Sequence, residues 1–242
     1  MPIYKMDDKI FDPQKYPWGY LDKKWSPLDE GDNLIAYFSA DSENVIINES
    51  NQVQEWHDQG PLLLTATPAS ANLPIYSSEF NCIISNLDRA VFYFNSVSAS
   101  LIVVCCRFES TRNYSSLLSP GSPWPGGTST LLYNHTTTDP VRYGDGYVNG
   151  GFVAPLSMGR YLNNDSIYSF IPTAPAVVNG NGDHNASFPT RSFLGRHYDI
   201  ILFGENTESM TDLRLKTEGY IAHKRGMTDL LGLSHPYKST AP

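Results

Sequence analysis

Short apolar runs separated by turn-forming stretches dominate the chain from residue 33 onwards. Residues 91–94 and 101–106 are continuous apolar runs, and 199–203 repeats the form near the end. Runs this short lack the length of a helix, and a strand covered on both faces gives such a pattern. The intervening stretches, such as 119–127, are rich in Gly, Pro, Ser and Asn, which favour turns. The pattern predicts an all-β fold, an antiparallel sandwich of two sheets.

One segment near the end instead has helical spacing. Thr211 is a suitable N-cap, and Lys224 and Arg225 come just before Gly226, a favourable helix end. Four residues share one face at this spacing: Leu213, Thr217, Tyr220 and Ile221. We therefore predict one C-terminal helix that packs this face on the sandwich.

Residues 1–32 show neither a strand period nor a helix period, so they cannot form a core of their own. Prolines keep this segment extended, while its aromatic rings favour burial. It either wraps around its own domain or inserts into a neighbouring subunit. We predict an extended N-terminal arm over 1–32 and one sandwich domain over 33–242. The rings of the arm are those of Tyr4, Phe11, Tyr16, Trp18, Tyr20 and Trp25.

Charge and composition narrow the class of protein. The net charge of -8 argues against a nucleic-acid binder, which needs a basic surface. No stretch approaches the about 20 apolar residues of a membrane helix, and the N-terminus lacks the apolar core of a signal peptide. Cys105 and Cys106 are adjacent in an apolar run and point to opposite faces of a strand. We expect buried, reduced thiols in a protein made in the cytoplasm.

The tail of the chain resembles the C-terminal signature of concanavalin A-like/laminin-G-like domains in phage virion proteins and bacterial surface proteins. It reads Leu-Lys-Thr-Glu-Gly-Tyr-Ile-Ala-His-Lys-Arg-Gly-Met over 215–227, followed by His-Pro-Tyr-Lys over 235–238 and a final Ala-Pro. Residues 34–41, 52–58, 100–108 and 200–204 are similar to strands of that family. The resemblance spans about residue 33 to the end. In that family a Trp, here Trp56, is often followed by the stretch Asp-x-Ser-Gly-x-Gly. In this chain the stretch is shortened to Asp58-Gln59-Gly60.

The resemblance implies a two-sheet jelly roll, frequently facing glycans and often without known chemistry. In this chain Trp56 is either a core anchor or a platform for a sugar, and we favour the core because large aromatic side chains mostly serve packing. We expect Glu218 and Tyr220 to lock the terminal helix onto the sheet.

No catalytic pattern is present in the sequence. Glucanases of this fold carry alternating carboxylates on one strand, and no such run occurs here. Neither a Gly-x-Ser-x-Gly elbow nor a His-Glu-x-x-His pair is found. We therefore predict a protein that is not an enzyme and has no cofactor. An enzymatic alternative, a polysaccharide depolymerase, requires carboxylates that converge from separate loops.

Two loops have the composition of binding sites. The stretch 143–150 alternates rings with small polar groups, as sugar sites do, and its glycan candidates are Tyr143, Asp145, Tyr147 and Asn149. The simpler interpretation is a hairpin with glycine turns. A second loop places Asn179, Asn181 and Asp183 at alternate positions, where their oxygens could hold Ca²⁺. The alternative is a flexible loop without metal.

Together these features predict a structural protein of a phage virion, a capsid decoration, head-fibre or tail-associated protein. The arm anchors it to other virion proteins, and the lectin-like domain faces outward. We expect a homo-oligomer, a trimer, with neither nucleic acid nor membrane as partner. The alternative is an adhesin that binds host surface polysaccharide through 143–150.

Overall fold

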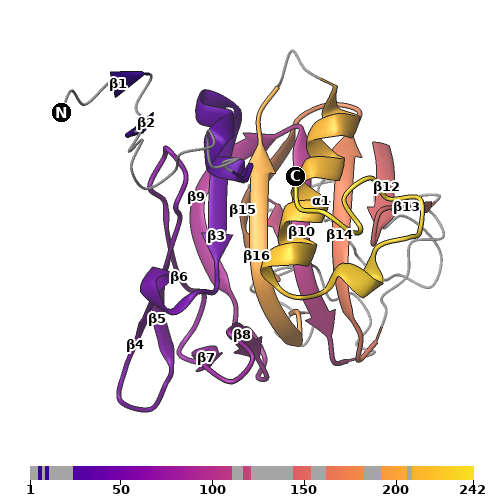
Figure 1. Ribbon diagram of the computed structural model, residues 1–242. Coiled ribbons are helices and arrows are strands. Elements are labelled where there is room, and N and C mark those ends of the chain that lie inside the picture. The colour runs from indigo at the N-terminus through magenta and orange to yellow at the C-terminus, as the bar shows by residue number, and fades with distance from the viewer. Residues whose placement is uncertain are drawn as a thin grey trace.

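The computed structural model describes residues 5–6, 9–10, 24–110, 117–120, 144–153, 162–182, 192–205 and 209–242. Within these ranges the chain is mostly β, and every pairing between its strands is antiparallel. Two large sheets face each other, which confirms the predicted all-β sandwich (Figure 1). A two-stranded pair, β1 (Lys5–Met6) and β2 (Lys9–Ile10), precedes them.

The first large sheet has eight strands. They are β3 (Leu34–Ser39), β7 (Ile75–Ser77), β8 (Cys82–Ser85), β10 (Leu101–Phe108), β12 (Gly144–Val148), β13 (Gly151–Val153), β14 (Asp165–Pro172) and β16 (Gly195–Phe203). Their order is β13-β12-β14-β10-β16-β8-β7. Strands β3 and β8 share one edge of β16. Strand β3 pairs with the C-terminal half of β16, and β8 pairs with the first three residues of β16.

The second sheet has six strands in the order β11-β15-β9-β6-β5-β4. Their bounds are β4 (Val45–Ile47), β5 (Val53–His57), β6 (Thr65–Pro68), β9 (Phe92–Ala99), β11 (Leu118–Pro120) and β15 (Ala176–Asn181). Three short 3-10 helices, η1 (Pro27–Asn33), η2 (Ser42–Asn44) and η5 (Thr228–Leu230), complete the described chain together with one α-helix.

The central strand β10 is covered on both faces, as its continuous apolar sequence predicts. Ile102, Val104 and Cys106 point into the core between the two sheets. Val103 and Cys105 point to the opposite face, into a second core under the α-helix. The two adjacent cysteines are therefore free, buried and on opposite faces. Burial raises the pKa of both thiols well above the usual value, which keeps them protonated.

Trp56 of β5 belongs to the core between the sheets. Its side chain is 1% exposed, packs against Phe38 and Phe92, and donates from Nε1 to the Ser39 carbonyl at 2.9 Å. The core interpretation of this residue is confirmed. Asp58 follows on the same strand end, and its carboxylate accepts hydrogen bonds from the backbone N–H groups of three residues, Tyr37, Gly60 and Leu64. The shortened loop after Trp56 is thus organised by an internal carboxylate.

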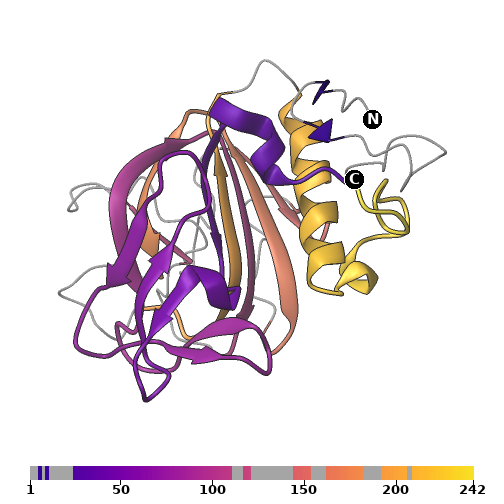
Figure 2. The ribbon, with the colours of Figure 1, turned by 60° about the vertical axis from the view of Figure 1, so that its left-hand side comes forward.

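The helix α1 (Met210–Lys224) lies across the outer face of the eight-stranded sheet (Figures 1 and 2). Leu213, Thr217 and Ile221 are buried against that sheet, as the helical spacing predicts. The N-cap is Ser209, so the prediction of Thr211 was two residues late. Gly226 has a φ of 65° directly after the end, which is the left-handed position that glycine favours there.

The fold therefore has three layers, the six-stranded sheet, the eight-stranded sheet and α1 (Figure 2). Each face of the eight-stranded sheet is covered, while the outer face of the six-stranded sheet has no helix of the described chain on it. Among the described residues no helix has the length and apolarity needed to cross a bilayer.

Candidate functional site

The stretch predicted as a sugar-binding loop is an edge hairpin. Strands β12 and β13 pair directly, and the turn between them is Asn149-Gly150. Both turn residues have positive φ, 53° and 84°, which is the geometry of a two-residue hairpin turn. Asn149 is further fixed because its Oδ1 accepts the backbone N–H of Ile167 at 2.8 Å. The hairpin interpretation is confirmed for residues 144–150, and the amide of Asn149 serves the fold.

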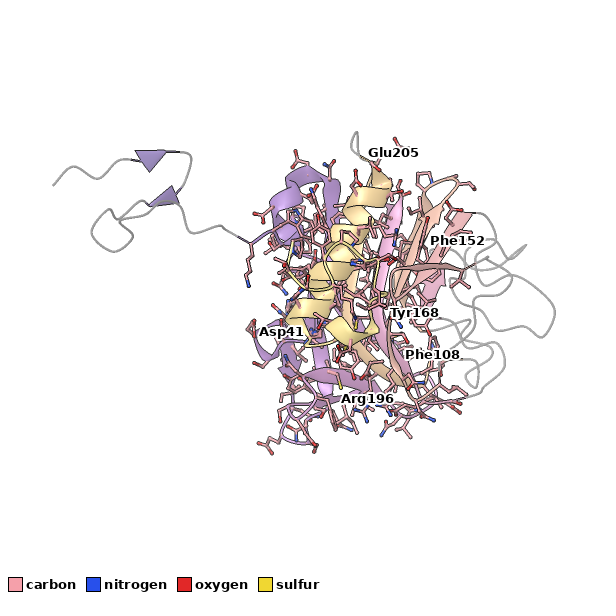
Figure 3. The ribbon with its side chains drawn as sticks, turned by 45° about the vertical axis from the view of Figure 1, so that its right-hand side comes forward. Asp41, Phe108, Phe152, Tyr168, Arg196 and Glu205 are labelled. Carbon is pink, nitrogen blue, oxygen red and sulfur yellow. The ribbon has the colours of Figure 1, made fainter. Side chains whose placement is uncertain are left out.

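Two of the four glycan candidates lie on one face of this hairpin. Tyr147 stacks under the Arg214 guanidinium, 3.7 Å from its ring centroid, and meets Phe152 edge-on at 5.6 Å. Asp145 is exposed two residues earlier on the same strand. Phe152 is 61% exposed at the rim of the sheet (Figure 3). An aromatic pair beside a free carboxylate thus remains accessible, while Tyr143 lies outside the described residues.

The Ca²⁺ candidates are only partly within the described chain. Asn181 ends β15, and its Oδ1 accepts the backbone N–H of Phe92 at 2.7 Å, so this oxygen is already used. Asn179 has a buried Oδ1 without a hydrogen-bond partner in the described chain. Asp183, the only carboxylate of the three, lies outside the described residues. Over the described ranges no three acidic, His or Cys side chains gather as metal ligands do.

The end of the predicted arm packs on its own domain. Trp25 donates from its backbone N–H to the Pro242 carbonyl at 3.0 Å and from Nε1 to Glu30 at 2.8 Å. Its ring meets Tyr220 of α1 edge-on at 6.1 Å. The 3-10 helix η1 follows and contacts β3. For residues 24–32 these contacts favour the alternative of wrapping the own domain, while the boundary at residue 33 stays a prediction. Tyr4, Phe11, Tyr16, Trp18 and Tyr20 lie outside the described residues.

Two buried charge networks hold α1 on the sheet. The first surrounds Glu218, whose carboxylate is fully buried and accepts two hydrogen bonds from Arg214 Nη1, at 2.8 and 2.7 Å. The Ser169 hydroxyl of β14 donates to it at 2.6 Å, and His235 Nε2 lies 3.2 Å away. His235 Nδ1 accepts the backbone N–H of Tyr237, so Nε2 carries the proton and donates to Glu218. Glu218 thus links the helix, the sheet and the C-terminal tail.

The second network gathers at the C-terminal end of α1. Arg225 donates two hydrogen bonds to the buried Asp199, from Nε at 2.6 Å and from Nη2 at 2.9 Å. Lys224 Nζ lies 2.6 Å from Asp41 Oδ2 and donates to the hydroxyls of Tyr37 and Ser39, each at 2.6 Å. These side chains come from β3 and the residue that caps η2, from β16, and from the end of α1 with its C-cap, which are far apart in the sequence.

The pKa values in this network follow from burial and pairing. Burial alone would lower the pKa of Arg225, but the hydrogen bonds and charge of Asp199 raise it. Burial would raise the pKa of Asp41, yet the hydrogen bonds from Lys224 and Ser39 lower it. Burial also raises the pKa of Tyr37, which stays protonated and donates or accepts toward Tyr220 at 3.2 Å. Two carboxylates do converge here from separate segments, but each is neutralised by a cation of α1 or its cap.

The predicted roles of Glu218 and Tyr220 in locking the helix are confirmed by these contacts. The sequence did not indicate His235 as the partner of Glu218, nor Asp41 and Asp199 as the partners of Lys224 and Arg225. The tail motif over 215–227 and 235–238 was the available signal, because it contains Glu218, Lys224, Arg225 and His235 together.

The outer face of the six-stranded sheet has a different character. The ring of Tyr93 lies against Gly180 of the neighbouring strand, where an added Cβ would be 2.8 Å from its Cδ1. Thr67 pairs with Tyr93 on the other side. Further along the face, His57 Nε2 lies 3.0 Å from Glu55 Oε2. This face therefore presents an aromatic ring, hydroxyls and a carboxylate together.

No protein-family model, curated protein or solved structure matches this chain.

Proposed function

We propose that the chain is a structural protein of a phage virion, without enzymatic activity, that displays a concanavalin A-like jelly-roll domain on the particle. The segment before residue 24 anchors it to other virion proteins, and the domain assembles as a homo-oligomer, a trimer. The supporting observation is the placement of the two ends of the domain. Trp25 and Pro242 are hydrogen-bonded to each other beside α1, on the opposite side from the outer face of the six-stranded sheet.

This placement puts the site of attachment and the displayed face on opposite sides of the domain. A segment that leads into Trp25 arrives on the helix layer, so a particle attached there leaves the open face of the other sheet toward solvent. That face carries the ring of Tyr93 with the hydroxyl of Thr67 beside it, and such a combination suits a polar, ring-shaped ligand.

Removal of residues 1–23 tests the anchor. The truncated chain begins at Lys24 and keeps the hydrogen bonds of Trp25 with Pro242 and Glu30, so we expect it to fold. Purified virions of the phage that encodes the chain should co-sediment with the full chain and not with the truncated one. Light scattering gives the oligomeric state of both. Equal co-sedimentation of the two chains would refute the anchor, and absence of the chain from purified virions would refute the virion proposal.

A second candidate is an adhesin that binds host surface polysaccharide at the β12–β13 hairpin. It is favoured by the accessible ring pair of Tyr147 and Phe152 beside the exposed Asp145. Phe152→Ala should then weaken binding to host polysaccharide about 5-fold, because stacking on an exposed ring contributes about 1 kcal/mol. Val177→Ala, at an exposed apolar residue of the other sheet, is the matched control. Unchanged binding in Phe152→Ala would exclude this hairpin as the site.

A further inference from the structure

Two arginine side chains face each other on the helix side of the eight-stranded sheet, beyond the C-terminal end of α1. Arg107 of β10 and Arg196 of β16 are direct partners across the two strands. Figure 3 shows Arg196 at this end of the sheet. Like charges directly opposite each other in a sheet are unfavourable, so the pair needs counter-charge.

The neighbouring carboxylates satisfy this pair only in part. Glu109 Oε1 accepts from Arg196 Nε at 2.8 Å, but it lies 3.7 Å from Arg107 Nε, beyond hydrogen-bond length. Asp165 is the strand partner of Arg107 on its other side, and its Oδ1 accepts the hydroxyl of Tyr198 at 2.7 Å. Among the described residues, one firm ionic hydrogen bond therefore serves two guanidinium groups.

Arg107 is left with unused donors. Its Nε is buried and has no hydrogen-bond partner in the described part of the chain. The side chain as a whole is 28% exposed, and that of Arg196 is 18% exposed, so a ligand in solvent reaches both. A buried donor without a partner is costly, and an arriving acceptor would relieve that cost.

An aromatic ring borders the two guanidinium groups. Phe80, in the turn between β7 and β8, is 45% exposed, and the Arg196 guanidinium lies 4.2 Å from its ring centroid. Planar guanidinium groups bind carboxylates through paired N–H donors, and an exposed ring contacts the C–H face of a sugar.

We propose that Arg107, Arg196 and Phe80 form a binding site for an acidic sugar, with the sugar carboxylate between the two guanidinium groups and its ring against Phe80. This site lies on the sheet that carries α1, apart from the β12–β13 hairpin, and does not depend on the virion proposal.

Chemical-shift titration of the full chain tests the site. A glucuronate-containing oligosaccharide should shift the backbone amides of Arg107 and Arg196, and an uncharged oligosaccharide of the same length should not. Arg107→Gln should weaken binding by about 10-fold or more, since it removes charge-assisted hydrogen bonds. The melting temperature of the Arg107→Gln variant should not fall below that of the natural chain, because Arg107 makes no hydrogen bond through Nε in the described chain. Lys24→Gln removes the same charge at an exposed residue beside Trp25 and should leave binding unchanged.

Phe80→Ala separates a sugar site from a simple anion site. The proposal expects weaker binding of the oligosaccharide to this variant, with little change for inorganic sulfate. If sulfate binds the natural chain as well as the oligosaccharide does and Phe80→Ala changes neither, the sugar assignment is overturned. If no anion shifts these amides, or if Arg107→Gln binds normally, the site itself is overturned.

Discussion

Gly150 and Gly226 both have a positive φ, 84° and 65°, but their surroundings differ. A Cβ on Gly150 would lie 2.6 Å from Cδ2 of His235, whereas one on Gly226 would meet nothing within 4 Å. Gly226→Ala should therefore lower the unfolding free energy only by the cost of holding an alanine backbone at positive φ, about 1 kcal/mol. Gly150→Ala adds a clash with a residue that binds Glu218, and should cost about 2–4 kcal/mol. Urea unfolding measures both, and equal costs would contradict the tight contact of the hairpin with the tail.

His197 of β16 is fully buried, and neither ring nitrogen has a hydrogen-bond partner in the described chain. Its ring packs on Phe193 with centroids 4.1 Å apart, and burial lowers its pKa from 6.5 to about 3. Protons therefore bind more tightly to the unfolded chain. The stability that depends on the neutral ring is complete above pH 6.5 and decreases as the pH falls toward about 3.

His197→Phe should remove this part of the acid sensitivity. Between pH 7 and pH 5 the natural chain should lose about 2 kcal/mol more unfolding free energy than the variant does. Urea unfolding at the two pH values gives the difference, and other titrating groups cancel in the comparison. Identical losses in both chains would show that His197 gains a proton without unfolding.

At the scale of elements, α1 depends on buried charges as well as on its apolar face. Glu218→Ala would leave Arg214, 5% exposed, without its carboxylate, and should cost about 3–5 kcal/mol. Asp212→Ala removes a carboxylate from the exposed first turn of the same helix, and should cost at most about 1 kcal/mol through the helix dipole. Unfolding in urea compares them; a small cost for Glu218→Ala would mean that the helix is held by apolar contacts alone.

The elements that were predictable from the sequence are those fixed by local pattern. Two local patterns indicate directly which residues are buried. They are the apolar run that forms β10 and the helical spacing of Leu213, Thr217 and Ile221. The partners of the buried charges were not predictable, because Asp41, just after β3, and Asp199 of β16 are brought to Arg225 only by the tertiary fold. The helix start was missed since Ser209 and Thr211 are both good N-caps, and packing decides between them.

At the scale of the whole molecule, the contacts of residues 24–32 bear on the predicted domain boundary at residue 33. Residues 24–32 have one proline and one aromatic ring, those of Pro27 and Trp25, and no periodic pattern, so they resembled the rest of the arm. The packing of Trp25 comes from non-local contacts with Tyr220 and Pro242, which no local pattern indicates. Likewise, only the fold distinguishes the predicted glycan-binding residues of the hairpin from one another. The side chain of Asn149 is hydrogen-bonded within the fold, while Asp145 is exposed.

Two truncations locate this boundary. Removal of residues 1–23 should leave the unfolding free energy of the domain unchanged, because Trp25 and η1 remain. Removal of residues 1–32 should lower it by about 2 kcal/mol or more, through loss of the Trp25 ring and its hydrogen bonds. Thermal and urea unfolding of the two chains give the comparison. Equal stability would place the boundary at residue 33.

The hydrogen bond between Trp25 and Pro242 also determines how the domain responds to mechanical load. A pulling force applied to the chain at Trp25 and at Pro242 acts on the domain at one point beside α1. Tension there peels η1 and the tail from the helix layer, one contact after another, and does not shear the sheets along their strands. The domain should therefore yield at its helix layer under low force while the two sheets stay paired.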